Sequence, residues 1–385
     1  MKVENLNKII SFLLTAVILI SVMLPLPYNT SAKAVKNNYK LSKSTYTTSS
    51  SLLYVNKKYI FTNSKGIYVK NSLKGKEKRI ANKTATSPIL SDGNKIYFVV
   101  TTGDSPEKYK YAIYSVKING KSTTKLKSGK GPANLITCYN GSLYYSDSPH
   151  LGALYTERIK KLNLKTKKTK VISGSKTAAH TVYFNGKIYF SVPTFSVTDM
   201  NRSKVYSVDL KTEKIKSVIN NASAYNYCCS NNLLGILSYK FDVRTAKTKN
   251  VYLYTVNKNN KITKSKRLSN NINVRFVSCN GKYAIYNDNS CNTYKIYLKS
   301  GVKKKLSKKI YFQHIICDMK SPSSTYLINV NSSNQIFVRK MVGDKLKKCK
   351  IAGKSYLKAA CDNLWVAEGN LLLGKNNKFK YYKIK

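Results

Sequence analysis

The stretch that decides the fold is residues 182–218, which read VYFNGKIYFSVPTFSVTDMNRSKVYSVDLKTEKIKSV. Its runs of Val, Ile, Tyr and Phe are typical of β-strands. Asn185-Gly186 separates the first two runs and predicts a tight hairpin turn, because both residue types tolerate a positive φ. Residues 211–214 predict a second turn before the final run. The stretch therefore predicts four short antiparallel strands.

The same pattern recurs along the chain, with further copies at Asp92-Gly93, Asn140-Gly141 and Asn280-Gly281. Eight units of about 44 residues predict an all-β fold, a single β-propeller of about eight four-stranded blades over residues 51–385, because radially packed sheets bury both of their faces. Seven blades, or two stacked all-β domains, are the alternatives. The residue before each first turn sets the register of the units: Val55, Ser91, Cys138, Phe184, Cys229, Cys279, Cys317 and Cys361.

These repeats resemble two kinds of bacterial propeller. Ser87 to Gly93 is similar to the strand and turn of exported propellers related to TolB, and Leu143 to Asp147 (Leu-Tyr-Tyr-Ser-Asp) is similar to the Tyr-Trp-Thr-Asp repeat of propellers related to the low-density-lipoprotein receptor. The resemblance covers about residues 50–385. The chain departs from these families in that the Asp of the repeat is clear in one unit, and the number of units exceeds six blades. The resemblance implies a protein- or polymer-binding module rather than a catalyst.

The first 34 residues are predicted to be an export signal. Lys2 and Lys8 precede an apolar run, and Ala32-Lys33-Ala34 offers a cleavage site after Ala34, with cleavage after Ala32 as the second choice. An uncleaved membrane anchor is the alternative, since the apolar run is long. Residues 35–50 form a polar lead-in that we expect to be disordered, and no second membrane-spanning segment is expected. The chain is therefore expected to be secreted or associated with the cell surface.

The charge is strongly positive, with 69 Lys and Arg against 16 Asp and Glu and a formal net charge of +53. Such a chain attracts polyanions. For an exported chain we expect an anionic cell-envelope polymer or a protein ligand as partner, and not intracellular nucleic acid. The alternative is that Lys serves as surface filler, because Lys greatly outnumbers Arg and Arg binds phosphate more specifically.

Loops that join the second and third strands of each unit should all emerge on one face of the ring. They are residues 101–110, 146–158, 191–204, 238–250 and 287–292, and they contain seven of the 16 acids. Long loops on a rigid scaffold commonly carry binding sites. The candidate ligand-binding residues on this face are Asp104, Asp147, His150, Asp199, Arg202, Asp242 and Arg244.

Turns that join the third and fourth strands should emerge on the opposite face, and they are rich in Lys. We expect them to bind a polyanion, although Lys on an outer strand also discourages edge-to-edge aggregation. The candidate polyanion-binding residues are Lys165, Lys167, Lys168, Lys258, Lys261, Lys303, Lys304, Lys305, Lys345, Lys347 and Lys348.

The eight cysteines do not suggest four disulfides, because five of them share the register position that Val, Ser and Phe also occupy. A position that accepts these residues is a packing position, where free Cys behaves as a small apolar residue. Cys228, Cys291 and Cys349 lie outside it, and a single bridge involving one of them is the alternative. No Cys-x-x-Cys occurs, so neither a metal nor another cofactor is expected.

Familiar catalytic motifs are missing: the sequence has no G-x-S-x-G, Walker loop or G-x-G-x-x-G. His180 and His314 fall on first strands, where they are expected to line the central channel, and His150 has no nucleophile motif beside it. We therefore expect a non-catalytic, monomeric exported binding module that docks electrostatically on anionic envelope or surface polymers. The alternatives are a protein-interaction scaffold that uses the long-loop face and, more remotely, a polysaccharide-cleaving enzyme.

Overall fold

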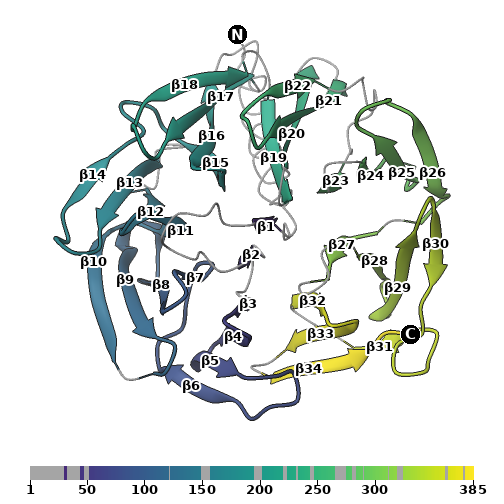
Figure 1. The fold of residues 1–385 in the computed structure, drawn as a ribbon, viewed down its shortest axis with the longest axis horizontal. Coiled ribbons are helices and arrows are strands. Elements are labelled where there is room, and N and C mark those ends of the chain that lie inside the picture. The colour runs from purple at the N-terminus through teal and green to yellow at the C-terminus, as the bar shows by residue number, and fades with distance from the viewer. Residues whose placement is uncertain are drawn as a thin grey trace, which may run out of the picture.

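The computed structural model describes residues 30–32, 44–46, 52–120, 122–148, 157–194, 202–219, 223–230, 233–242, 247–264, 275–279, 283–288, 290–310, 312–318, 324–359, 363–375 and 378–385. These residues form a ring of eight blades around a central axis (Figure 1). The predicted all-β propeller of eight blades is confirmed.

Each blade is an antiparallel sheet whose strands follow the order of the chain from the axis outward. In blades 1 to 4 the strands are β3 (Leu52–Val55), β4 (Lys58–Asn63), β5 (Gly66–Lys70), β6 (Lys78–Ala81); β7 (Leu90–Ser91), β8 (Lys95–Thr102), β9 (Lys110–Lys117), β10 (Thr123–Lys130); β11 (Ala133–Tyr139), β12 (Ser142–Asp147), β13 (Arg158–Asn163), β14 (Thr169–Val171); β15 (Ala179–Phe184), β16 (Lys187–Thr194), β17 (Arg202–Asp209) and β18 (Ile215–Ile219).

Blades 5 to 8 continue this order. Their strands are β19 (Ser223–Ser230), β20 (Leu233–Asp242), β21 (Lys247–Asn257), β22 (Ile262–Lys264); β23 (Arg275–Cys279), β24 (Tyr283–Asn287), β25 (Thr293–Tyr297), β26 (Lys303–Ser307); β27 (His314–Cys317), β28 (Thr325–Val330), β29 (Gln335–Val342), β30 (Lys345–Lys348), with β31 (Leu357–Lys358) also pairing with β29; β32 (Asn363–Ala367), β33 (Asn370–Lys375) and β34 (Lys378–Lys383).

The inner hairpins have the predicted turn chemistry. Asn140 and Asn185 adopt φ of 44° and 47°, and the glycines that follow them, Gly141 and Gly186, adopt 67° and 77°. Two consecutive positive φ values match the right-handed twist of the flanking strands. In units 1 to 7 the register residue lies at or next to the end of the inner strand. The prediction is wrong in unit 8, where the inner strand is β32 (Asn363–Ala367) and the tight turn is Glu368-Gly369, so Cys361 precedes the strand instead of ending it.

The hydrophobic core lies between neighbouring blades. Between blades 2 and 3, Val99 and Ile113 belong to the same buried cluster as Leu143 and Leu162. Equivalent clusters join blades 1 and 2, 3 and 4, 4 and 5, 6 and 7, 7 and 8, and 8 and 1. Burial of each such side chain stabilises the fold by about 1.5–3 kcal/mol, so the blades depend on one another for stability.

The ring closes by packing, as expected, and each described strand of blades 8 and 1 pairs within its own blade. Trp365 of blade 8 packs in one cluster with Leu52 of blade 1, and the Tyr59 hydroxyl donates to Glu368 Oε1 at 2.5 Å. Blade 8 has three strands among the described residues. Beside its third strand, Lys350 and Lys385 exchange two backbone hydrogen bonds, so a segment of blade 7 covers this edge.

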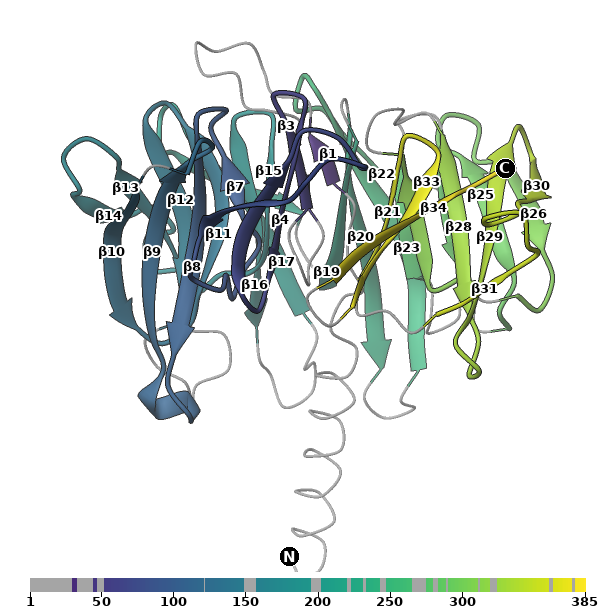
Figure 2. The ribbon, with the colours of Figure 1, turned by 90° about the horizontal axis from the view of Figure 1, so that it is seen from below.

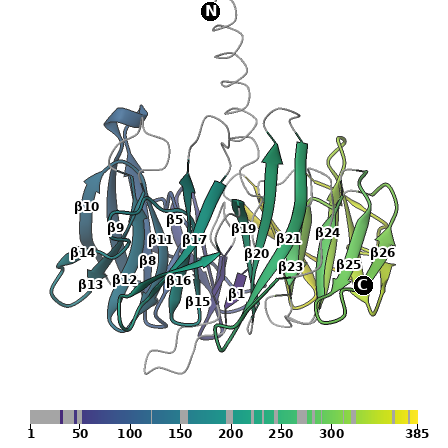
Figure 3. The same ribbon diagram turned by 90° about the horizontal axis from the view of Figure 1, so that it is seen from above.

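The two faces of the ring differ as the repeat predicts. The β8–β9 connection carries a short 3-10 helix, Pro106–Lys108, which is the coiled ribbon at the lower edge in Figure 2. In Figure 3 the ends of β20 and β21 reach the same edge as this helix. We call this side the loop face. The opposite side, where the antiparallel order places the turns between third and fourth strands, is called the turn face.

The region before the first blade is not wholly without regular structure. β1 (Thr30–Ala32) pairs with β2 (Ser44–Tyr46), and both lie inside the ring in Figure 1. The lead-in was expected to be disordered, but it supplies β2 because Ser, Thr and Tyr suit an extended backbone. Cleavage after Ala34 would remove β1. Among the described residues, no helix has the length and apolar character that a membrane span requires.

Candidate functional site

A buried ionic cluster lies near the loop face between blades 2 and 3. Asp147, the last residue of β12, is 3% exposed and was expected on an exposed loop. The Lys160 ammonium is 2.6 Å from its Oδ2, and the Tyr111 hydroxyl donates to the same oxygen at 2.8 Å. These two contacts offset part of the cost of burying the carboxyl group. Asp147 Oδ1 has no hydrogen-bond partner among the described residues.

Glu157 lies next to this cluster, one residue before β13. Its backbone carbonyl accepts a 2.7 Å hydrogen bond from the Ala178 N–H, which fixes the segment against the entry to blade 4. Burial raises the pKa of the Glu157 carboxyl, and the charge of Asp147 adds to this rise. The pKa of Glu157 is therefore held above its ordinary value by burial beside a second carboxyl group.

Tyr111 reaches Asp147 because its partner across the strands is a glycine. Tyr111 pairs with Gly129 of β10, and a Cβ at position 129 would lie 2.6 Å from the Tyr111 ring. The ring also packs against Tyr145, with the two centroids 6.0 Å apart. Burial and the neighbouring Tyr145 and Asp147 raise the pKa of Tyr111, so its hydroxyl remains a donor. Blade 2 thus contributes a fixed hydrogen-bond donor to a site on blade 3.

Exposed cations surround the cluster on the loop face. Arg158 is exposed and is the cross-strand partner of Asp147. Lys110 and Lys130 are exposed and pair with each other across β9 and β10. These three side chains can attract an anionic ligand to the mouth of the site. The arrangement places a carboxyl group of raised pKa beside a second carboxyl group and exposed cations, which together suit acid–base chemistry on an anionic substrate.

The other loop-face candidates are not brought into this cluster. Asp104 is exposed and forms an ion pair with Lys108 at 3.4 Å. His150, Asp199 and Arg244 lie outside the described residues. Arg202 is the first residue of β17, and Asp242 is the last residue of β20. The side chains of both also lie outside the part of the chain that the structure describes. Of the predicted set, Asp147 alone is placed in the cluster by the part of the chain that the structure describes.

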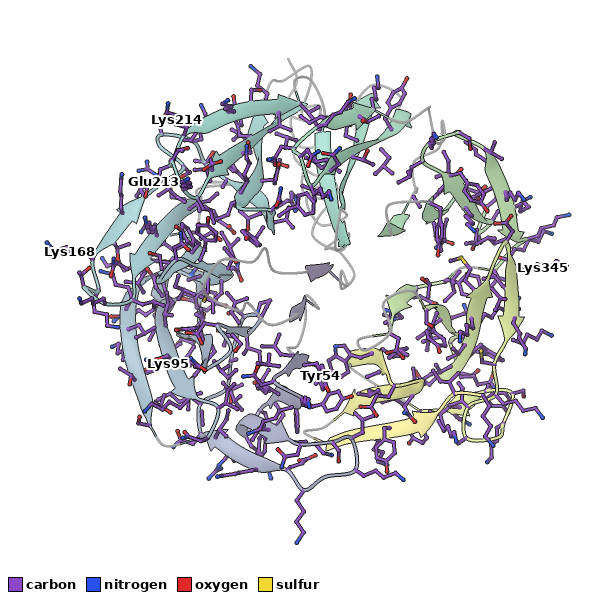
Figure 4. The ribbon with its side chains drawn as sticks, in the orientation of Figure 1. Tyr54, Lys95, Lys168, Glu213, Lys214 and Lys345 are labelled. Atoms are coloured by element: carbon purple, nitrogen blue, oxygen red, sulfur yellow. The ribbon has the colours of Figure 1, made fainter. Side chains whose placement is uncertain are left out.

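All eleven predicted polyanion-binding lysines are exposed. Lys168 and Lys345 point away from the ring at its outer rim (Figure 4). Lys304 differs from the rest, because its ammonium pairs with Asp344 Oδ2 at 2.5 Å. Lys167 Nζ donates to the backbone carbonyl of Leu164.

Two carboxylates of the turn face join neighbouring blades. Glu213 of blade 4 accepts from Lys161 at 2.8 Å and from Lys170 at 2.7 Å, both on blade 3 (Figure 4 labels Glu213). Asp344 of blade 7 accepts in the same way from Lys295 and Lys304 of blade 6. In both cases the two lysines are cross-strand partners. We call each set an ionic clamp; these lysines are used inside the protein rather than for a ligand.

Cysteines and histidines take the positions that the sequence predicted, where the structure describes them. Cys138 is buried with a free thiol, and burial raises its pKa. Cys291 and Cys349 are also free. His180 and His314 lie on the innermost strands β15 and β27, and burial lowers the pKa of both, to about 4 for His314. Within the described ranges, no group of three His, Cys, Asp or Glu could hold a metal ion.

Sequence reasoning missed Glu157, Tyr111 and Lys160. Glu157 was counted among the loop acids, but its environment depends on Asp147 and Ser146, which are nearby only after the hairpin forms. Tyr111 lies 36 residues before Asp147 on another blade. One signal was present: in a hairpin over residues 148–156 that pairs Asp147 with Arg158, Lys160 lies two residues further along the strand, on the same face of the sheet as Asp147.

Comparison with known proteins supports the fold and no closer relationship. No protein-family model matches the chain, and no curated protein matches it in sequence. Among solved structures, a prolyl endopeptidase studied for its inter-domain dynamics has a TM-score of 0.53 at 12% identity, covering 78% of this chain and 49% of that one. The chain thus spans about half the length of that enzyme. At this identity the likeness concerns the fold.

Two further structures are similar to a lesser degree. TolB from Acinetobacter baumannii has a TM-score of 0.36 at 15% identity, covering 74% of this chain and 76% of that one. An oligogalacturonate lyase in complex with manganese has a TM-score of 0.45 at 9% identity, covering 71% and 82%. The propeller fold that the resemblance to TolB-like proteins implies is confirmed by the ring of eight blades.

The expectation of a non-catalytic binding module is wrong. It rested on the premise that a propeller of this kind implies binding rather than catalysis. The fold is shared with a prolyl endopeptidase, so the propeller gives no ground for excluding an enzyme. Two expectations are therefore wrong: that electrostatic docking is the whole function, and that the chain is not an enzyme.

Proposed function

We propose that this chain is an exported enzyme that cleaves an anionic polysaccharide at the loop face between blades 2 and 3. The observation that carries the proposal is a pair of neighbouring carboxyl groups, Asp147 and Glu157, in which burial, with a contribution from the charge of Asp147, raises the pKa of Glu157. Such pairs divide the acid and charge-stabilising roles in glycosidic bond cleavage.

Glu157 is assigned the role of general acid. It is partly buried, and its raised pKa keeps a proton available for the oxygen of the leaving sugar. Asp147 is too deeply buried to contact a substrate directly. Its role is to supply a fixed negative charge that stabilises the positive charge developing on the sugar ring and raises the pKa of Glu157. Lys160 and Tyr111 hold that charge in position.

The substrate class follows from the surrounding charge. Arg158, Lys110 and Lys130 are exposed near the cluster, and the whole chain carries a formal charge of +53. A uronic-acid or sulfated polymer would be attracted over long distances and oriented by these cations. A neutral glycan would gain neither effect.

The experiment is a cleavage assay of the purified chain on a uronic-acid polymer, a sulfated polymer and a neutral glucan. Release of reducing ends measures cleavage, and absorbance of unsaturated products distinguishes elimination from hydrolysis. Glu157→Gln should lower kcat/KM on the anionic polymer by at least about 100-fold, because it removes the proton donor. Glu107→Gln, an exposed carboxylate on the same face, is the matched control and should leave the rate unchanged.

The proposal fails if none of the polymers is cleaved, or if Glu157→Gln and Glu107→Gln have equal rates. Thermal unfolding of both variants, measured in parallel, separates loss of the acid from loss of the fold.

A further inference from the structure

The turn of blade 3 that faces blade 2 has the backbone of an ionic clamp but carries a lysine in place of the acid. In blade 4 the Glu213 N–H donates to the Asp209 carbonyl at 2.7 Å. In blade 3 the Lys167 N–H donates to the Asn163 carbonyl at 2.9 Å. Glu213 and Lys167 also share a positive φ, of 58° and 60°. Lys167 is therefore the structural counterpart of Glu213.

The neighbouring strands of blade 2 differ from those of blade 3 in a matching way. Glu213 reaches back to blade 3, where it accepts from Lys161 and Lys170. Lys161 lies two residues before the end of the third strand and pairs with Lys170 on the fourth. At the same places in blade 2, Ser115 pairs with Thr124. The contact between blades 2 and 3 thus carries neither the acid nor the two lysines of the clamp.

A second carboxylate of blade 4 is also replaced by lysine. Lys187 begins β16, and its cross-strand partner Asp209 forms an ion pair with it at 3.8 Å. Lys95 begins β8, but its cross-strand partner is Lys117, and both of these lysines are exposed. Like charges directly opposite each other in a sheet are destabilising. Blade 2 therefore holds two ammonium groups together at a place where blade 4 pairs opposite charges.

These replacements bring three lysines together on the turn face. Lys95 begins β8, Lys117 ends β9, and Lys167 lies in the turn of the next blade; Figure 4 labels Lys95. Partial desolvation lowers the pKa of Lys167, and the charge of Lys95 lowers it further, so these two ammonium groups lie near each other. Lys167 donates to the Leu164 carbonyl at 2.6 Å, which leaves two more of its three donors.

The acid of the adjacent turn does not pair with these lysines. Asp92 Oδ1 accepts from the backbone N–H groups of Asn94 and Lys95 at 2.8 Å each, and Oδ2 accepts from the Tyr97 hydroxyl at 2.6 Å. In the described part of the chain, no carboxylate forms an ion pair with any of the three lysines. Three ammonium groups and one carboxylate leave two positive charges at this place.

We propose that Lys95, Lys117 and Lys167 form a binding site for a doubly charged oxyanion of the phosphate class. The anion would occupy the place that the Glu213 carboxylate takes in blade 4, and it would neutralise the two remaining charges. A phosphate group has enough oxygens to accept from several ammonium groups at once, and lysine is a common phosphate ligand. The site lies on the turn face, whereas the Asp147 cluster lies toward the loop face. The proposal therefore does not depend on the proposed enzymatic activity.

The test is isothermal titration calorimetry of the full chain with inorganic phosphate at constant ionic strength and about pH 8, where phosphate carries close to two negative charges. The whole chain attracts anions, so a control variant must change the charge equally. Lys167→Glu gives blade 3 the residue that blade 4 accommodates at the same φ. It should weaken phosphate binding at least about tenfold, because one donor is lost and a negative charge is added.

Lys168→Glu is the matched control, since it makes the same change of charge one residue away, where the side chain points outward at the rim (Figure 4). It should weaken phosphate binding less than about threefold, because an exposed charge contributes little. Lys95→Gln should weaken binding several-fold, and thermal unfolding of each variant confirms that it is folded. Glucose 6-phosphate distinguishes the two sources of such an anion: binding at least as tight as that of inorganic phosphate assigns the site to phosphate monoesters, and weaker binding assigns it to free phosphate.

Two results would overturn the proposal. One is a parent chain that does not bind phosphate. The other is an equal phosphate affinity of Lys167→Glu and Lys168→Glu, which would show that the anion responds to the overall charge and not to the three lysines.

Discussion

The contacts between blades 3 and 4 and between blades 6 and 7 use the same ionic clamp in different surroundings. In the first, the Lys161 side chain is 29% exposed beside Glu213; in the second, the Lys295 side chain is 4% exposed beside Asp344. Lys295 also lies 4.2 Å from the ring centre of Tyr283 and 4.7 Å from that of Tyr297. The repeat therefore determines where an ionic clamp lies, and the neighbouring aromatic residues determine how strongly the stability of the fold depends on that clamp.

The same contrast extends to the two halves of the ring. Blades 2 and 3 bury a carboxylate near the loop face, whereas blades 5 to 7 expose aliphatic residues on the turn face. In both places the backbone keeps the four-stranded pattern of the other blades. Side chains at equivalent positions can thus either stabilise the fold or change the chemistry of the surface, while the backbone fold stays the same.

The largest loss of stability is expected where the clamp is most buried. Asp344→Asn leaves the Lys295 charge enclosed by aromatic rings without its carboxylate, which is strongly unfavourable. Glu213→Gln leaves Lys161 and Lys170 in partial contact with water and should cost at most about 1 kcal/mol. Urea unfolding of both variants measures the difference. Equal midpoints would show that the two clamps are equivalent and that the burial of Lys295 has no energetic role.

Blades 4 and 7 can also be compared through their inner histidines. Burial lowers the pKa of His314 to about 4, below the usual value of about 6.5. Between these two pH values the unfolded chain binds a proton at His314 and the folded chain does not. Stability should therefore fall as the pH drops from about 6.5 to about 4, by roughly 3 kcal/mol in total. Burial acts in the same direction on His180.

Urea unfolding across this pH range checks the prediction. His314→Gln should remove most of the fall, and His180→Gln should leave the His314 part in place. The clamp carboxylates titrate lower, because their lysine partners hold the pKa of Glu213 and Asp344 below the ordinary range. Their contribution is present above the ordinary carboxyl pKa and is lost only in stronger acid. A stability that is level between pH 6.5 and 4.5 would argue against buried neutral histidines.

The sequence predicted the features that are local. Asn-Gly turns such as Asn185-Gly186 and the recurring register residues gave the blade count, because turn chemistry and strand alternation act within a few residues. The exposed turn lysines were also predicted, since a turn on the rim of a blade has little to pack against. These features do not depend on what the neighbouring blade carries.

The candidate site was not predicted because it depends on contacts between blades. Lys161 meets Glu213 52 residues further on, and Lys295 meets Asp344 49 residues further on. These separations approximate one repeat, so a lysine on a third strand and an acid in the next unit's turn could have indicated the clamps. Gly129 offered no such signal, because its role depends on the Tyr111 ring that lies across it. The raised pKa of Glu157 arises only when the fold buries this carboxyl group beside Asp147.

The protonation state of Glu157 is the most direct test of the proposed site and needs no substrate. The Glu157 carboxyl can be titrated by NMR with labelled glutamate in the parent chain, in Asp147→Asn and in Asp104→Asn, with Glu157→Gln used to assign the signal. We predict a pKa above the ordinary glutamate value of about 4.3 in the parent, a lower pKa in Asp147→Asn, and no change in Asp104→Asn. A Glu157 carboxyl that titrates in the ordinary range, or that does not respond to Asp147→Asn, would contradict the assignment of these two residues as an acid and its charged neighbour.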